Sequence, residues 1–449
     1  MKKSKNGGSK WRVGLARVDI TPKYSIRMSG YAWRTKPSEG IHDRLMAKAM
    51  AFDDKAGTRG ILITTDLIGF DRKFADEIFA AIRLKTGVPR EHMIINYSHT
   101  HSGPVMGRSK VNYSDILLDS ERTAVKKYTD DLGRKIVALA VRALADLKPS
   151  RLAYQLFDGV TSQGGAGVVS FAMNRRRYTP KKVDNAPYPR GYVDRSVPVL
   201  KVTTPAGKLR CIVFGYSCHN TTIGTQLISA DYAGYAQRYI EKRHKGVQAM
   251  FMQGCGADAN PWPRETFPLA KRHGETLGAE VCRVMKTEFT PVHGRLKIAF
   301  DHVNLPLEPK PTEKKLQDML HQESYYAKTV AKIRKLIASG KPWAKYYRTP
   351  LAVWQLGRDL TLVRISGEVV TDYIPLMEQT LGPLNLWVAG YCDDYFAYLP
   401  SARVHREGGY EGRDFISDYG FLAATAESAL LKKARNLARR VGRPIPATK

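Results

Sequence analysis

Acidic residues are scarce in this sequence of 449 residues, which has 42 Asp and Glu against 72 Lys and Arg and a formal net charge of +30. It also lacks an apolar run of about 18 residues, the length that a membrane-spanning helix needs, because its longest mostly apolar runs, 60–69 and 384–390, are far shorter. No heptad pattern or longer internal repeat occurs, which excludes coiled coils and solenoids. Its apolar share of 43% excludes a wholly disordered chain.

Cysteine is rare as well: there are five, an odd number, and none forms a C-x-x-C pair. This excludes a disulfide framework and favours a reduced compartment. The basic N-terminus has no apolar stretch of the kind found in signal peptides, so we expect a cytoplasmic location and a flexible basic tail over residues 1–10.

The excess of basic residues has two explanations. It could indicate a nucleic acid or an anionic membrane surface as partner, or the charges could simply cover the surface. We favour the second, because the basic residues are scattered and no zinc-finger or RNP-type motif accompanies them. Nucleic acid is therefore not expected as a partner. A basic amphipathic helix predicted over 421–441 either lies on an anionic membrane surface or packs into the core.

From residue 11 onward, strand-like and helix-like segments alternate, which predicts one large α/β domain over 11–449 with a mostly parallel or mixed sheet flanked by helices. Residues 308–346 interrupt this pattern with charged helical turns and are predicted to be a helical insertion. Strands are expected at 59–69, 91–98, 209–216, 247–253, 360–365 and 384–391. Helices are expected at 73–86, 124–147, 231–245, 269–287, 371–381 and 421–441.

Polar residues follow five of these strands, at the end where ligands gather in open α/β sheets. They are His99 and His101 after 91–98, His219 after 209–216, Asp258 and Asn260 after 247–253, Glu368 after 360–365, and Asp393, Asp394 and Tyr395 after 384–391. These residue types bind metals or move protons, so the pattern predicts a functional site at this edge of the sheet.

The heptapeptide SHTHSGP, residues 98–104, is the sharpest of these signals. Because side chains alternate along a strand, His-x-His is expected to place both imidazoles on one face. His99 or His101, together with His219 and Glu368, would supply the three protein ligands of a catalytic zinc ion. The alternatives are a polar turn, a structural histidine at 219 and a carboxylate that complements a helix dipole at 368.

The loop MQGCGADANP, residues 252–261, is rich in glycine and follows an apolar strand. It either presents backbone N–H groups to an anion or forms a tight turn that Asp258 caps. It matches neither the P-loop nor the dinucleotide-binding fingerprint.

Taken in order, these segments resemble the neutral/alkaline non-lysosomal ceramidase family, specifically its N-terminal catalytic domain. The segments that carry the resemblance are VGLARVDITP with MSGYA, GIHDRLMAKAMAF, SHTHSGP, SCHNTTIG with ISADYAGYA, GCGADANP, ISGE, and YCDDYFAYLP with EGGYEG. They extend from about residue 13 to 412, which is nearly the whole chain.

The resemblance implies a zinc amidase that cleaves the N-acyl bond of ceramide, with one Zn²⁺ per chain. The implied metal ligands are His99, His219, Glu368 and Tyr398. Other residues that the resemblance places in the site are His101 as a catalytic group that is not a ligand, Tyr410 as a second active-site tyrosine, and Arg175 as the arginine that meets the substrate oxygen. Zinc would activate a water molecule for attack on the amide.

The sequence departs from the family at several points. Asn260 stands where the family has a serine, so hydrolysis would depend on the metal-activated water, because asparagine cannot form an acyl-enzyme. Val105 and Met106 replace a Gly-Gly pair, and no C-terminal immunoglobulin-like domain is expected. Members of the family are often exported, which differs from the cytoplasmic location expected above.

Three hypotheses about function follow. The first is a zinc-dependent amidohydrolase of the ceramidase type. The second is a related metal hydrolase that acts on another acylated or ester substrate, such as an N-acyl amino sugar. The third is a basic binding protein without enzymatic activity, whose binding would depend steeply on salt.

Overall fold

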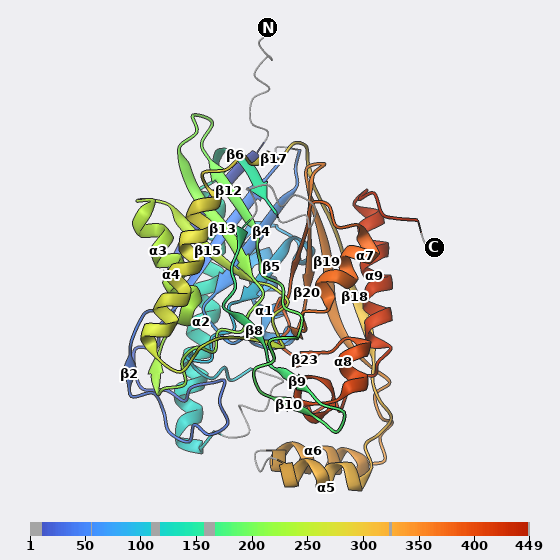
Figure 1. The fold of residues 1–449 in the computed structure, drawn as a ribbon. Coiled ribbons are helices and arrows are strands. Elements are labelled where there is room, and N and C mark those ends of the chain that lie inside the picture. The colour runs from blue at the N-terminus through green and yellow to red at the C-terminus, as the bar shows by residue number, and fades with distance from the viewer. Residues whose placement is uncertain (1–10, 55, 109–116, 157–166, 323–325, 448–449) are drawn as a thin grey trace.

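The computed structural model describes residues 11–54, 56–108, 117–156, 167–322 and 326–447; the predicted basic tail, 1–10, lies outside these residues. The described chain forms four layers, helices on a large sheet and then a second sheet covered by further helices (Figure 1). The predicted α/β domain is confirmed. None of the helices in these ranges has the length and apolar content needed to cross a bilayer.

The large sheet has nine strands and is mixed. In spatial order its strands are β15 (Gln248–Gln253), β13 (Leu209–Tyr216), β12 (Val199–Thr203), β6 (Lys148–Gln155), β1 (Trp11–Asp19), β3 (Met46–Asp53), β4 (Arg59–Thr65) and β5 (Met93–Tyr97), with β17 (Thr290–Pro291) beside β6. Its outer face packs against α1 (Arg72–Thr86), α2 (Asp119–Ala145), α3 (Asp231–Arg243) and α4 (Phe267–Val284).

The second sheet has four strands, in the order β18 (Leu296–Pro306), β19 (Tyr346–Leu356), β20 (Leu360–Ile365) and β22 (Leu386–Ala389). Aromatic residues such as Phe52, Trp354 and Trp387 fill the core between the two sheets. The other face is covered by α7 (Tyr373–Leu381) and α9 (Ala426–Arg440), at the right of Figure 1.

Within the two sheets, three pairs of strands are parallel: β4 with β5, β13 with β15, and β20 with β22. The remaining pairs are antiparallel, so of the two expected forms the sheet is mixed rather than mostly parallel. The reason is that several antiparallel pairs, such as β1 with β3, β3 with β4, β12 with β13 and β19 with β20, join strands with no helix between them in the chain and so leave no strand–helix alternation in the sequence.

Helix α9 buries Leu430, Ala434 and Leu437 against the second sheet. Its apolar face is therefore occupied, and the core-packed alternative for the segment 421–441 is correct. The predicted insertion, 308–346, contains two helices, α5 (Glu313–Gln322) and α6 (Ala327–Ala338). They pack against Phe415 and Phe421 at one end of the molecule, at the bottom of Figure 1.

Several short elements lie near the ends of the strands. They are β2 (Gly40–Ile41) with β14 (Leu227–Ile228), β7 (Gly167–Val168) with β11 (Ser196–Val197), β8 (Ala172–Asn174) with β16 (Ala259–Pro261), β9 (Arg176–Tyr178) with β10 (Val183–Asn185), β21 (Glu368–Val369) with β23 (Tyr398–Leu399), the 3₁₀ turn Arg90–His92, helix α8 (Ala402–Glu407) and a π-helical turn Tyr410–Asp414.

Asn96, buried within β5, joins strands of both sheets. Its side-chain amide donates to the carbonyl groups of Gln253 in β15 (3.2 Å) and Gly390 after β22 (2.8 Å), and its oxygen accepts from the Gln253 backbone N–H (2.8 Å). The carboxyl ends of β5, β15 and β22 are thereby held together, which brings the loops that follow them to one place.

Candidate active site

His99 and His101 lie in the turn that follows β5, and both are buried. His99 adopts a left-handed backbone conformation, with φ of 63°, which is uncommon for a residue with a side chain and is typical of functional turns. The Nε2 atoms of the two imidazoles are 3.1 Å apart. The two rings therefore converge as expected, but through this turn and not through strand alternation.

His219 and Glu368 complete the cluster. His219 follows β13, and Glu368 begins β21 after the end of β20. One carboxylate oxygen of Glu368 lies 3.1 Å from Nε2 of His219 and 3.2 Å from Nε2 of His99. Candidate ligand atoms of His99, His101 and His219 all lie within 4.8 Å of one another. The structure thus brings together four residues that the sequence places on three separate strands.

Backbone carbonyl groups determine which nitrogen of each ring carries the proton. Nδ1 of His99 lies 2.8 Å from the carbonyl oxygen of Ile68, and Nδ1 of His219 lies 2.8 Å from that of Gly256. Because a carbonyl group only accepts, each Nδ1 is the donor, and in the neutral form of the ring Nε2 is the nitrogen with the lone pair. Orienting contacts of this kind to the second ring nitrogen are typical of metal-binding histidines.

Burial and nearby charges keep the rings of His101 and His219 uncharged at neutral pH. Burial, reinforced by Arg175, lowers the pKa of His219 to about 4. Burial and then His99 hold the pKa of His101 well below its usual range. Burial opposes ionisation of Glu368, but the facing histidines hold its pKa well below the usual value for a carboxyl group.

This donor set fits a divalent metal ion. Nε2 of His99 and Nε2 of His219 lie 3.2 and 3.1 Å from the same oxygen of Glu368, so two nitrogen donors and one carboxylate converge on one place, as the ligands of a divalent ion do. Two histidine nitrogens and one carboxylate are also a common ligand set for catalytic zinc. Nδ1 of the neighbouring His101 is buried with no hydrogen-bond partner among the described residues. This nitrogen is therefore available to a reacting group.

Tyr398 and Arg175 adjoin the histidine cluster. In the β21–β23 pair, Tyr398 lies directly opposite Glu368. Its hydroxyl accepts a hydrogen bond of 3.0 Å from Nη2 of Arg175, and burial raises the pKa of this tyrosine well above its usual value. Arg175 follows β8 and is 6% exposed, so its charge acts where little water screens it.

Asn260 and Tyr410 lie around the same arginine. The side-chain oxygen of Asn260 is 3.4 Å from Nη1 of Arg175 and accepts a 3.1 Å hydrogen bond from Thr221. The guanidinium group lies 5.8 Å from the centre of the Tyr410 ring. The predicted site residues thus form two adjacent groups, the histidine half (His99, His101, His219, Glu368) and the arginine half (Arg175, Tyr398, Tyr410, Asn260).

The other predicted strand-end residues have structural partners. Asp258 accepts from the backbone N–H of Thr371 at 2.7 Å, and burial raises its pKa to about 6. Asp393 lies against Arg364 and Arg90, and Asp394 accepts from Thr349 at 2.9 Å. The ring centroid of Tyr395 lies 5.3 Å from that of His99. The two aspartates at 393 and 394 therefore fasten the strand end instead of joining the histidine cluster.

Sequence reasoning missed two residues that shape the site. Gly30, with φ of +97°, would bring a Cβ atom to within 2.5 Å of the His101 side chain, so a larger residue at this position would displace that ring. The second is Asn96, which is part of the predicted apolar strand 91–98 and to which the sequence assigns no role. The signal that marks it is a lone amide inside an otherwise apolar segment, EHMIINYS. In contrast, Val105 and Met106 are fully buried in the core with α1 and α2.

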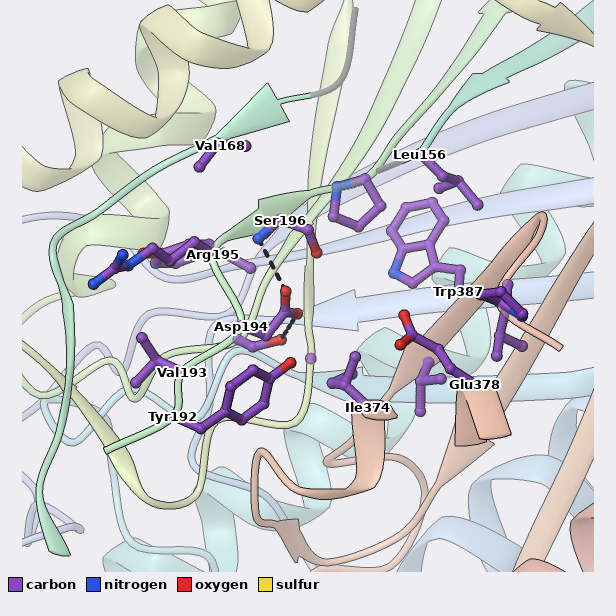
Figure 2. Close-up of a pocket in the computed structure, with 17 residues that line it drawn as sticks. Leu156, Val168, Tyr192, Val193, Asp194, Arg195, Ser196, Ile374, Glu378 and Trp387 are labelled. Atoms are coloured by element: carbon purple, nitrogen blue, oxygen red, sulfur yellow. Dashed lines mark hydrogen bonds between the residues drawn. The ribbon is translucent and has the colours of Figure 1, made fainter. Parts of the chain in front are cut away.

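The structure also contains a cavity of about 520 Å³ (Figure 2). It is lined by apolar groups such as Ile374 and Trp387 and by two carboxylates, Asp194 and Glu378. Asp194 accepts from the hydroxyl of Ser217 at 2.7 Å. None of the predicted site residues lines this cavity, so it is distinct from the histidine cluster.

Comparisons with known proteins point to one family. The family described as neutral/alkaline non-lysosomal ceramidase, N-terminal, matches residues 11–262. Neutral ceramidase of Pseudomonas aeruginosa is 28% identical over 262 residues, which are 56% of this chain and 37% of that protein. Neutral ceramidase A of Dictyostelium discoideum is 26% identical over 253 residues, 54% of this chain and 33% of that protein. The match thus spans only about a third of the length of these relatives.

Solved structures extend the likeness of the fold to the remainder of the chain. The crystal structure of neutral ceramidase from Pseudomonas aeruginosa superposes with a TM-score of 0.74 at 21% identity, covering 99% of this chain and 76% of that one. A second structure, a ceramidase complexed with C2, gives the same TM-score at 20% identity. With the family match covering more than half of its residues, the chain belongs to the neutral/alkaline non-lysosomal ceramidase family.

Proposed function

We propose that this chain is a zinc-dependent amidohydrolase that cleaves the N-acyl bond of a ceramide-like lipid. The observation that carries the proposal is the convergence of the Nε2 atoms of His99 and His219 on one carboxylate oxygen of Glu368, directly beside Arg175 and Tyr398. His99, His219, Glu368 and Tyr398 are the residues that would hold the metal. A bound zinc ion supplies a Lewis acid and an activated water at neutral pH.

Arg175 and His101 have separate roles in the proposed hydrolysis. Hydrolysis adds water across the amide, so the carbonyl oxygen gains negative charge and the nitrogen must leave with a proton. Arg175, held beside Tyr398 and Tyr410, is placed to stabilise that charge. His101 is neutral, lies 3.1 Å from His99 and can accept a proton and return it to the leaving amine.

Asn260 has no nucleophilic atom, and its side-chain oxygen accepts from Thr221 and Arg175. We assign it to positioning the guanidinium group. This residue also supports a second candidate, in which the same site hydrolyses another acylated substrate such as an N-acyl amino sugar. Both candidates share the chemistry and differ in what lies on either side of the scissile bond.

The test combines metal analysis with a panel of substrates. The purified full chain is expected to contain about one zinc ion and to release fatty acid from ceramides faster than it releases the acid from N-acyl amino sugars or esters. Removing the metal with a chelator should abolish hydrolysis, and added zinc should restore it. Full activity in the metal-free protein would refute the proposal, and a preference for amino sugars would select the second candidate.

A further inference from the structure

Two consecutive arginines share one buried carboxylate. Nε of Arg175 lies 2.7 Å from one oxygen of Glu411, and Nη1 of Arg176 lies 2.8 Å from the other. Glu411 and Arg176 are 3% exposed, which is even less than Arg175. Buried guanidinium groups need an ionised acceptor to offset the loss of water, and Glu411 serves both at once.

The two arginines direct their remaining nitrogens to different places. Arg175 uses Nη2 for the Tyr398 hydroxyl and Nη1 for Asn260, so its outer edge faces the arginine half of the site. Nη2 of Arg176 donates to the carbonyl oxygen of Gly408 (2.9 Å) and to the carboxylate of Glu407 (3.2 Å). Neither of these residues belongs to the arginine half. Because a guanidinium group is planar and rigid, fixing Nε of Arg175 fixes the directions of its other two nitrogens.

Glu411 is delivered by the π-helical turn Tyr410–Asp414. Two glycines with positive φ, Gly408 (75°) and Gly409 (76°), lead into this turn. A Cβ atom at Gly409 would approach the Val183 side chain of β10 to 2.9 Å, so the turn lies close against the β9–β10 hairpin. The Glu411 carboxylate therefore fastens the turn that carries Tyr410 to the strands that carry Arg175 and Arg176.

We propose that Glu411 is a positioning residue for amide hydrolysis, acting through Arg175. Among the described residues, the hydrogen bonds and ion pairs of the Glu411 side chain go to Arg175 and Arg176 and to none of the expected metal ligands. Glu411 sets the edge that Arg175 presents to the reacting carbonyl oxygen and to Tyr398. This inference rests on the proposed function. The competing explanation is that Glu411 only neutralises Arg176 and so supports the fold.

Three variants separate these explanations. Glu411→Gln removes the charge, and Glu411→Asp keeps it but draws it back by one methylene. Glu407→Gln is the matched control, because Glu407 also binds Arg176 but does not contact Arg175. Each full-length variant is assayed for kcat and KM on the amide that the wild-type chain hydrolyses fastest, for thermal unfolding, and for labelling of Arg175 by phenylglyoxal, read by mass spectrometry.

We expect both Glu411 variants to lower kcat, by up to about 100-fold for Glu411→Gln, with KM nearly unchanged and Arg175 labelled faster. Glu407→Gln should match the wild type in all three readouts. If Glu411→Gln does not fold, Glu411→Asp decides.

The proposal is overturned if a folded Glu411 variant keeps the wild-type kcat and labelling, or if Glu407→Gln causes the same loss. Should the wild type hydrolyse no amide, the proposed function fails, and the labelling of Arg175 alone then decides whether Glu411 holds it.

Discussion

The histidine half and the arginine half of the site are held in different ways. In the histidine half, backbone carbonyl groups of Ile68 and Gly256 fix the rings of His99 and His219. In the arginine half, Arg175 is fixed by the side chains of Glu411, Tyr398 and Asn260. Backbone contacts persist when a neighbouring side chain changes, whereas side-chain contacts do not. The arginine half should therefore be the more sensitive of the two to distant substitutions.

The largest effect is expected from His219→Ala, which removes a ligand atom from the histidine half, the half with three of the four expected metal ligands. Without this imidazole, only His99 and Glu368 of the histidine half remain as expected ligands. We expect the zinc content to fall steeply and the rate of hydrolysis to fall by on the order of 1,000-fold or more. Metal analysis and kcat/KM on the best amide substrate measure this. His293→Ala, at an exposed position, is the control and should change neither. A zinc content unchanged in His219→Ala would show that the ion, if present, binds elsewhere.

Arg175→Lys should distinguish the roles of the two halves, because the substituted residue belongs to the arginine half only. Lysine keeps the charge but cannot reach Glu411, Tyr398 and Asn260 together, so kcat should fall by about 100-fold while the zinc content stays the same. Arg177→Lys is the matched control, since Arg177 is exposed and pairs with Asp184 at 3.0 Å. Equal losses in both variants would mean that the oriented hydrogen bonds of Arg175 have no special role in the reaction.

The same comparison explains how much could be predicted from the sequence. Strands β13 and β20 have the expected boundaries because each is a bounded apolar run, and His99, His219 and Glu368 gather because they follow strand ends. The sequence does not predict strand β3, MAKAMAFD, because alanine and methionine favour helices. In the structure nearly every residue of this strand is buried. Its tertiary contacts outweigh its intrinsic preference.

The arginine half could not be derived in that way. Arg175 and Glu411 are 236 residues apart in the chain, and no periodicity links a short strand to a π-helical turn. Arg175, Tyr398 and Tyr410 were expected only because of the family resemblance, and Glu411 was not expected at all. Side-chain networks that span distant loops leave no local pattern, and only the folded chain shows them.

Asn96→Ala tests how far the histidine half depends on the packing of strand ends. The substitution leaves the backbone N–H of Gln253 and the carbonyl group of Gly390 buried without this partner, which should lower the free energy of unfolding by about 2–3 kcal/mol. Urea denaturation measures the loss, and Asn304→Ala, at an exposed position of β18, should change it by less than about 0.5 kcal/mol. A loss no larger than that of the control would show that other contacts hold the strand ends together.

The smallest effect is expected from Asn260→Ser, which places a hydroxyl group where the family has a serine. The contact that it removes is weak, since Asn260 lies 3.4 Å from Arg175, and Glu411 and Tyr398 still hold the guanidinium group at 2.7 and 3.0 Å. We therefore expect kcat to change by no more than about threefold and mass spectrometry to detect no acyl group on residue 260 during turnover. A covalent adduct there, or a rate raised well beyond that range, would mean that a side chain can supply the nucleophile. The roles assigned to the two halves would then be wrong, because the attacking group would come from the arginine half.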